Sequence, residues 1–222
     1  TGIVIIGGSI AGLLASILVA SAYRDGPYPF PSRPFEWSRV GKLLRHRETL
    51  LATGGYLGHM WELYAMWTWI SAFLFAAAAG VVSDTVIDLV VFGAIGAGAL
   101  GCVWGGAAAD RIGRHRVVNL AMAISGGCCL VAGFVFQAPF SFLVILTWVW
   151  GFFVVADSAQ FSALVTEVAP QDSVGTALML QTSLGFLLTM VTIQAVPAIV
   201  GVLGWQWAFA FLALGPASGI CS

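Results

Sequence analysis

Charge is scarce in this sequence. Only 9% of its 222 residues are Asp, Glu, Lys or Arg, whereas soluble domains carry roughly a quarter. Hydrophobic residues make up 59% of the chain, and the mean hydropathy is +0.96. Because a water-soluble fold of this length cannot bury so much apolar surface, the composition excludes an ordinary soluble globular protein.

Cysteine is scarce too, with four residues in the chain. Cys102, Cys128, Cys129 and Cys221 lie in apolar stretches without metal-ligand spacing, which argues against a disulfide scaffold and against a zinc site. The first apolar stretch lacks a basic leading segment and a signal-peptidase site, so it is a poor signal peptide. We expect no metal and no cofactor, and we expect the sequence to be a fragment of a longer chain.

What the sequence does contain is long apolar runs, each close to the roughly 20 residues that a helix needs to cross a bilayer. Seven blocks cover residues 2–23, 50–79, 86–107, 117–137, 140–165, 176–200 and 205–222. The runs are continuous and lack the alternation of barrel strands, so they predict helices. We therefore predict an all-α fold, a polytopic membrane helix bundle.

The basic residues define an orientation for these helices. All nine lie in two segments: Arg24, Arg33, Arg39, Lys42, Arg45 and Arg47 between the first two blocks, and Arg111, Arg114 and Arg116 between the third and fourth. Loops rich in Lys and Arg remain on the cytoplasmic side. Both segments are therefore predicted to be cytoplasmic, with an even number of crossings between them.

The segment from Tyr23 to Thr49 is the one long polar stretch. Its first part contains Gly26, Pro27, Pro29, Pro31 and Pro34 and predicts a linker. Its second part, 37–49, places apolar residues at helical spacing among basic ones. This pattern fits a basic amphipathic helix on the anionic inner leaflet, and it fits an ordinary solvated basic loop equally well.

Between the third and fourth blocks the sequence reads Gly106-Ala-Ala-Ala-Asp110-Arg111-Ile-Gly113-Arg114-His115-Arg116. This resembles the cytoplasmic loop signature of the major facilitator superfamily, G-x-x-x-D-R-x-G-R-R, with His115 at a position that is usually basic. Glu167-Val-Ala-Pro170, followed by Gly175-Thr-Ala, resembles the loop between helices ten and eleven of that family.

The resemblance implies a place for every block. Residues 1–23 would be the last helix of the N-terminal half, 24–49 the cytoplasmic central linker, and 50–222 the C-terminal six-helix half of a twelve-helix transporter. The blocks would thus be helices six to twelve, with the missing N-terminal half as an obligatory partner. We expect such a protein in the bacterial cytoplasmic (inner) membrane, as a multi-pass protein.

The resemblance also implies a cytoplasmic gate that the motif holds shut in the outward-facing state. The residues concerned are Gly106, Asp110, Arg111, Gly113, Arg114 and Glu167. Asp110 can lie against the positive end of a neighbouring helix, and Arg111 or Arg114 can pair with a carboxylate such as Glu167. The alternative is that these charges only fix the topology.

Ionisable residues inside membrane helices are costly and are functional candidates by default. The second block contains a stripe on one helical face, formed by Gly55, His59, Glu62, Met66, Trp69 and Phe73. The fifth block contains Asp157 and Gln160, and Asp157 has about the same predicted depth as His59. In the family that the motif resembles, these two blocks would line the central pathway.

We therefore predict a solute and proton pathway at these helices. Glu62 and Asp157 are the candidate proton or cation sites, His59 tunes or relays, and Trp69 and Gln160 shape the pocket. An intrahelical pair between His59 and Glu62 is the bland alternative, and a metal site is weaker because two ligands do not complete one.

Several further residues are expected to serve packing or their own hydrogen bonds. Gly93, Ala97, Gly101 and Gly105 recur every four residues, and Gly126 and Gly127 form a pair, which favours close helix contacts. In 176–200 the polar residues can satisfy themselves on backbone or on neighbouring helices; these are Gln181, Thr182, Thr189, Thr192 and Gln194.

The function expected from these features is secondary active transport of a small solute by alternating access, coupled to protons. The chain would contact solute, protons and the lipid bilayer, would bind no nucleic acid and would not be an enzyme. One alternative is a membrane sensor or scaffold that has a transporter shell and transports nothing. Another is a flavin-dependent oxidoreductase, suggested by Gly7, Gly8 and Gly12, but no second strand with an acidic ribose ligand follows.

Overall fold

The computed structural model describes residues 2–24 and 37–222, which fall into two compact units divided after Phe35. The first unit contains α1, Gly2–Ala22, whose described side chains are exposed along its whole length. The prolines and glycine of the predicted linker and Arg33 lie outside the described residues. Arg24 is described and exposed.

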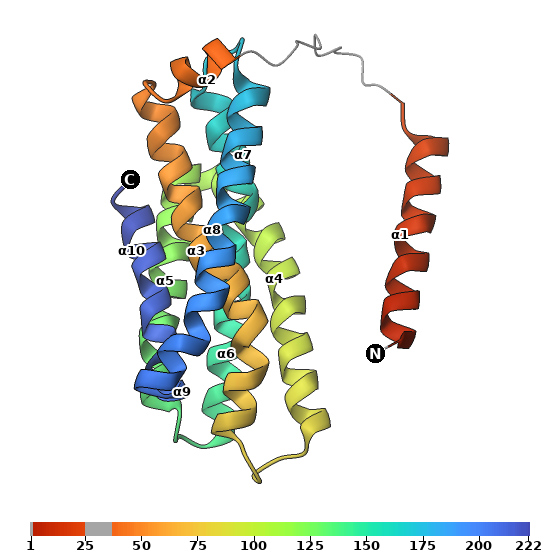
Figure 1. Cartoon of the computed structure of the whole chain (residues 1–222), viewed down its shortest axis with the longest axis vertical. Coiled ribbons are helices and arrows are strands. Elements are labelled where there is room, and N and C mark those ends of the chain that lie inside the picture. Colours follow the sequence, from red (N-terminus) through yellow and green to blue (C-terminus); the bar gives the residue numbers. More distant parts are fainter. Residues whose placement is uncertain (1, 25–36) are drawn as a thin grey trace. The chain divides into compact units, whose positions relative to one another are not determined.

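The second unit is a bundle of helices that run up and down along one direction (Figure 1). Its elements are α2 (Trp37–Leu43), α3 (Arg47–Ala77), α4 (Asp84–Ile112), α5 (Arg114–Val135), α6 (Phe140–Ala156), α7 (Ser158–Val168), α8 (Val174–Leu203), α9 (Trp205–Ala208), η1 (Phe209–Ala213) and α10 (Leu214–Ile220). Within the described ranges there is no β-strand. The predicted all-α class is confirmed.

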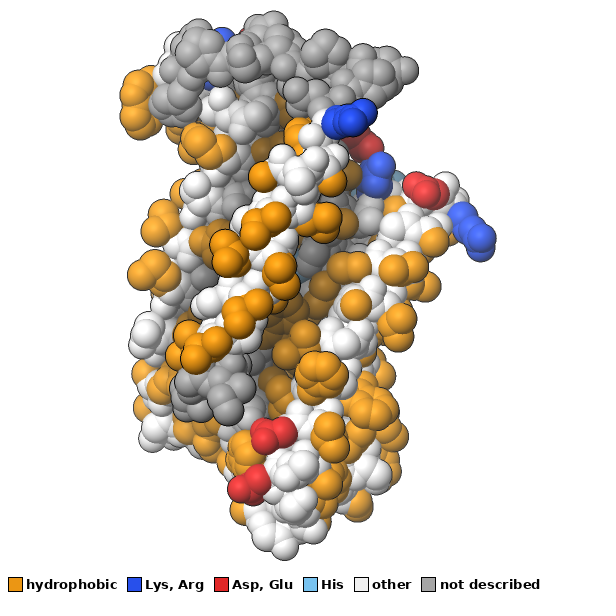
Figure 2. Space-filling model, turned by 90° about the vertical axis from the view of Figure 1, so that its right-hand side faces the viewer, with side chains coloured by type: hydrophobic (Ala, Val, Ile, Leu, Met, Phe, Trp, Pro, Cys, Tyr) orange, Lys and Arg blue, Asp and Glu red, His pale blue; other side chains and the backbone are white. Residues whose placement is uncertain are grey.

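Five helical segments of the described chain are long and apolar enough to cross a membrane. They are Ile5–Ala22, Asp84–Ile112, Arg114–Val135, Phe140–Val168 and Val174–Leu203. Apolar side chains cover long stretches of the helix surfaces, whereas charged side chains gather near helix ends (Figure 2). These features fit a multi-pass membrane protein.

The other two predicted blocks differ from simple apolar spans. Helix α3 has 31 residues, which is long enough, but His59, Glu62 and other polar residues lower its hydropathy, and it is not among the five. The last block divides into α9, η1 and α10. Pro216 in α10 has no N–H to donate to the carbonyl one turn earlier, and the residues of that turn form a 3₁₀ helix.

The predicted fifth block is also interrupted. Helix α6 ends at Ala156 and α7 begins at Ser158, with Asp157 between them at φ −92° and ψ −13°. The apolar run from Phe140 to Val168 is continuous in sequence, so hydropathy alone does not reveal this break. Asp157, the one carboxylate of the predicted block 140–165, therefore lies where the backbone departs from a regular helix.

Small residues bring α4 and α6 into close contact, as the glycine pattern predicted. A Cβ atom on Gly101 would collide with the backbone of Phe152, and one on Gly105 with the backbone of Ala156. The buried face of α4 is defined by Ile87, Val90, Ala94, Gly98, Gly101, Gly105 and Ala109. Ala94 and Gly98, rather than Ala97, therefore continue the contact toward the N-terminus of α4.

The two adjacent glycines of α5, Gly126 and Gly127, have different roles. A Cβ atom on Gly126 would meet the Pro216 ring at 2.9 Å, whereas one on Gly127 would meet no atom within 4 Å. Gly126 thus allows α10 to approach α5, as predicted for both residues, and Gly127 faces open space.

The amphipathic helix of the linker forms, but it is shorter than predicted. It ends at Leu43, a turn covers the next three residues, and α3 begins at Arg47 rather than at Leu50. His46 is the N-cap of α3, and its ring Nδ1 accepts a hydrogen bond from the Thr49 backbone. Leu43 is buried against Val165 and Val174, so part of the apolar face of α2 contacts the bundle instead of lipid.

Candidate functional site

The predicted polar face of α3 is turned into the bundle. His59 is 3% exposed and Glu62 is 1% exposed. The other residues of the stripe are buried as well, except Trp69, which is half-buried. Helix α3 can carry these groups inward because α4, α6, α7, α8 and α10 all pack against it.

His59 and Asp157 form a buried pair. His59 Nδ1 lies 3.0 Å from Asp157 Oδ1, and both side chains are at most 3% exposed. On the other side of the ring, Ser158 Oγ lies 3.1 Å from His59 Nε2. The break between α6 and α7 thus supplies both partners of the imidazole, a carboxylate and a hydroxyl.

Aromatic rings enclose this pair on the α3 and α7 side. The centroid of the Phe161 ring lies 5.3 Å from that of His59 and 5.9 Å from that of Tyr56. Apolar walls exclude water and strengthen any interaction between charges inside them. The His59–Asp157 pair therefore lies in an apolar environment with little access to water.

Glu62 has a different set of partners, all of them donors. Trp150 Nε1 donates to Oε1 at 2.6 Å, and the Cys129 thiol donates to the same oxygen at 3.2 Å. Ser125 Oγ donates to Oε2 at 2.8 Å. Three donors on two oxygens suit an ionised carboxylate, which can only accept. Glu62 thereby joins α3 to α5 and α6.

His59 and Glu62 share a helical face without bonding to each other. No hydrogen bond or ion pair joins them in the described part of the chain; their partners come from α5, α6, α7 and the break before it. The alternative of an intrahelical pair is therefore wrong. The stripe was recognised from the sequence, whereas Ser125, Cys129, Trp150 and Ser158 gave no signal, because small polar residues and Trp are common in membrane helices.

Arg114 connects the gate motif to the interrupted helix. Its Nε donates to Glu167 Oε1 at 2.7 Å, and a terminal nitrogen donates to Gln160 Oε1 at 2.8 Å. Of the two arginines considered as partners of Glu167, the structure thus selects Arg114. Gln160, which lies three residues after Asp157 and was predicted to shape the solute pocket, instead accepts a hydrogen bond from Arg114.

The remaining motif residues have unequal roles. Gly113 adopts φ +92°, a conformation that L side chains rarely adopt, and it forms the turn between α4 and α5. Asp110 and Arg111 are exposed. A Cβ atom on Gly106 would meet nothing within 4 Å. In the described unit, close contact therefore does not explain this glycine.

Trp69 lies apart from the ionisable pair and ties two helices together. Its Nε1 donates to the Ile193 carbonyl oxygen at 2.9 Å, and its ring centroid lies 6.1 Å from that of Trp205. The indole therefore joins α3 to α8, and the predicted role in a solute pocket remains a prediction.

Gln181 in α8 is a polar residue that the sequence reading left unassigned. It is 1% exposed, and both its amide oxygen and its amide nitrogen have no hydrogen-bond partner among the described residues. The expectation that it satisfies itself is wrong. Thr189 and Thr192 do satisfy themselves, by donating to carbonyl oxygens of their own helix.

One turn after Gln181, Gly185 approaches Tyr56 and Met60 of α3. The amide therefore belongs to the seam between α3 and α8, close to the rings that enclose His59. Buried polar groups nearly always have a partner, counting ordered water. The unpaired amide is therefore a candidate position for a bound water or solute.

No family model matches the chain, and no curated protein matches it significantly. In the described ranges, no group of three or more His, Cys, Asp or Glu side chains is arranged to hold a metal ion.

Proposed function

We propose that the complete protein is a proton-coupled secondary transporter of the major facilitator superfamily, located in the bacterial cytoplasmic membrane. The chain would supply the C-terminal half and the helix before it. The observation that carries the proposal is the buried His59–Asp157 pair at the interruption between α6 and α7. Interrupted helices that present ionisable groups inside the bilayer characterise the binding sites of secondary transporters.

The pair can exist in two charge states with different bonding. With Asp157 ionised and His59 protonated, the two attract each other across 3.0 Å in a dry environment. Protonation of Asp157 removes the negative charge and weakens the attraction. The contact between α3 and the interrupted helix then loosens, which couples proton binding to a change in packing.

Arg114 supports a link from this site to the cytoplasmic end. It holds Gln160 and Glu167, both on α7, and Asp157 directly precedes that helix. A shift of α7 after protonation would therefore strain two hydrogen bonds of Arg114. This is the arrangement that a gate requires if it is to open in response to the proton site.

Glu62 serves as a fixed anchor in this proposal. Its three donors already satisfy both carboxylate oxygens, so a proton added to Oε2 would force the Ser125 hydroxyl to donate instead to the Met122 carbonyl oxygen, 3.4 Å away. Asp157, whose ion-pair partner among the described residues is His59, is the better carrier. Of the two candidate proton or cation sites, Asp157 is then the carrier and Glu62 the anchor.

The test is uptake into proteoliposomes that contain the complete protein, with an inward proton gradient and a panel of small labelled solutes. We expect at least one solute to accumulate only with the gradient. We expect Asp157→Asn to abolish accumulation while counterflow of the same solute continues, and Glu62→Gln to retain accumulation. If no solute in the panel moves and gradient-driven proton entry is absent, the sensor or scaffold alternative is favoured.

A further inference from the structure

The polar face of α2 forms a cationic hollow where the chain turns into α3. The hollow has a volume of about 530 Å³. Its lining residues recur at helical steps of three and four; they are Ser38, Gly41, Lys42, Arg45 and His46. Leu43 lies buried against α7 and α8 on another side of the helix. Packing of the apolar side thus leaves the cations together on the face that borders the hollow.

Gly41 keeps the middle of the hollow open. A Cβ atom built there would meet no heavy atom within 4 Å, so a ligand can approach the backbone at Gly41, next to Lys42. Arginine and lysine are the residues that bind phosphate oxygens, arginine through its planar fork and lysine as a point charge. We propose that this hollow binds a phosphate group, and that the phosphate is the headgroup of an anionic membrane lipid.

The neighbouring side chains favour a lipid as the source of that phosphate. Trp37 is 79% exposed and directly precedes the first lining residue, Ser38. Leu44 is 59% exposed and lies between Lys42 and Arg45 along the chain. Exposed Trp and Leu beside Lys and Arg characterise helices that lie at the headgroup level. A lipid can place its phosphate among the cations while its chains contact these apolar residues, which a free phosphate cannot do.

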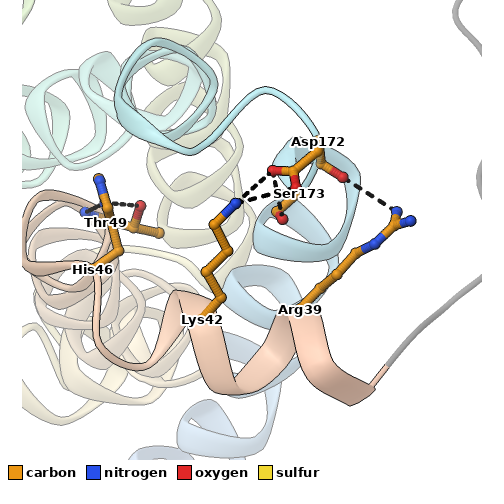
Figure 3. A network of polar contacts seen from close by, with 6 residues as sticks. All are labelled: Arg39, Lys42, His46, Thr49, Asp172 and Ser173. Atoms are coloured by element: carbon orange, nitrogen blue, oxygen red, sulfur yellow. Dashed lines mark hydrogen bonds and ion pairs between the residues drawn. The ribbon is translucent and has the colours of Figure 1, made fainter.

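A bound phosphate would compete with a contact already present. Lys42 Nζ lies 3.1 Å from each carboxylate oxygen of Asp172, between α7 and α8 (Figure 3). Both side chains are about half exposed, at 53% and 43%, and exposed ion pairs are weak. The Arg39 bond to the Asp172 carbonyl oxygen would remain. When the lipid binds, its phosphate replaces the Asp172 carboxylate as the partner of Lys42. Helix α2 is then held less firmly to the start of α8.

The experiment measures binding of short-chain lipids to the complete protein in neutral detergent by thermophoresis. Dioctanoyl phosphatidylglycerol is the anionic lipid, dioctanoylglycerol is the lipid without phosphate, and inorganic phosphate is the free anion. We expect Arg45→Gln to weaken phosphatidylglycerol binding roughly fivefold, the contribution of one cation near an anionic surface. Gly41→Leu should weaken it as much without a change of charge, and Asp172→Asn should tighten it.

Arg116→Gln is the matched control, because Arg116 is an exposed cation of the other basic segment. It should leave the affinity unchanged. An equal loss in Arg116→Gln and Arg45→Gln, or full affinity in Gly41→Leu, overturns the site; unchanged affinity in Asp172→Asn overturns the competition. Displacement of the lipid by millimolar inorganic phosphate would support a phosphate site but would overturn the lipid headgroup as the group that occupies it. None of these variants alters His59 or Asp157, so the outcome is separate from that of the transport assay.

Discussion

Asp157 lies between the end of α6 and the start of α7, and its Oδ1 lies 3.0 Å from His59 Nδ1 of α3. The carboxylate is therefore attached to the backbone at the point where that backbone is least regular. A change in its charge acts on α6 and α7 at their junction, whereas Glu62 acts from inside the uninterrupted helix α3. Because Asp157 lies at a helix junction and Glu62 inside a continuous helix, we expect substitutions of the two carboxylates to have different effects.

Glu62 should be necessary for stability but replaceable by its amide. In Glu62→Gln the amide oxygen can accept from Trp150 and Cys129, and the amide nitrogen can donate to Ser125 Oγ. Ser125 can then donate to the Met122 carbonyl oxygen, which lies 3.4 Å away. In Glu62→Ala the Trp150 N–H is left buried without an acceptor, which costs about 1–3 kcal/mol.

We therefore expect the apparent melting temperature of the purified protein to fall clearly in Glu62→Ala and little in Glu62→Gln. Trp150→Phe, combined with Glu62→Ala, should recover part of the loss because it removes the orphaned donor. A larger loss in Glu62→Gln than in Glu62→Ala would contradict the anchor role.

The packing of α4 on α6 gives a sharp comparison between adjacent glycines. Gly105→Ala places a methyl group against the backbone of Ala156, directly before Asp157, and should destabilise the protein by about 1–3 kcal/mol. Gly106→Ala meets nothing within 4 Å and should be neutral, or stabilising by up to about 1 kcal/mol. Thermal unfolding of both variants in the same detergent measures the difference, and equal effects would refute the close contact.

The sequence predicted much of this architecture because membrane helices leave a strong signal. Apolar runs located the helices, and the stripe on α3 placed His59 and Glu62 on its buried face. Hydropathy did not reveal the break at Asp157 or the division of the last block, because both depend on backbone geometry inside apolar runs. The partners of Glu62 were missed because single Ser, Cys and Trp residues carry no positional pattern.

Gln181 provides a test of where a solute or water binds. The Gln181 amide has no partner among the described residues. Gln181→Leu should therefore leave the melting temperature unchanged or raise it, because the free energy of unfolding stays the same or increases by about 1 kcal/mol. If the amide binds the solute, the KM for uptake should rise a few-fold, the value of one neutral hydrogen bond. Gln194→Leu, at an exposed position of the same helix, is the matched control and should change neither quantity. A lower melting temperature with unchanged KM would show that the amide holds a structural water.

The contact between Lys42 and Asp172 should respond to acid in a definite direction. The hydrogen bond from Lys42, followed by that from Ser173, lowers the pKa of Asp172 below its ordinary value of 3.8. A carboxylate with a lowered pKa in the folded state contributes fully above its ordinary pKa, and the contribution is lost as the pH falls through the lowered value. The contact should therefore persist at pH 5 and weaken progressively below about pH 3.8.

Hydrogen exchange of the α2 amides, corrected for the intrinsic effect of pH, measures this contact. We expect protection of α2 to be constant from pH 7 to pH 5 and to fall at lower pH, because protonated Asp172 no longer attracts the Lys42 ammonium. Asp172→Asn should already show the lower protection at pH 7 and little further change in acid, and high salt should shift the wild type toward the variant. Glu48→Gln, which removes an exposed carboxylate from the first turn of α3, should keep the acid response. If the acid response also disappears in Glu48→Gln, the protection of α2 depends on the overall charge of this region and not on the contact between Lys42 and Asp172.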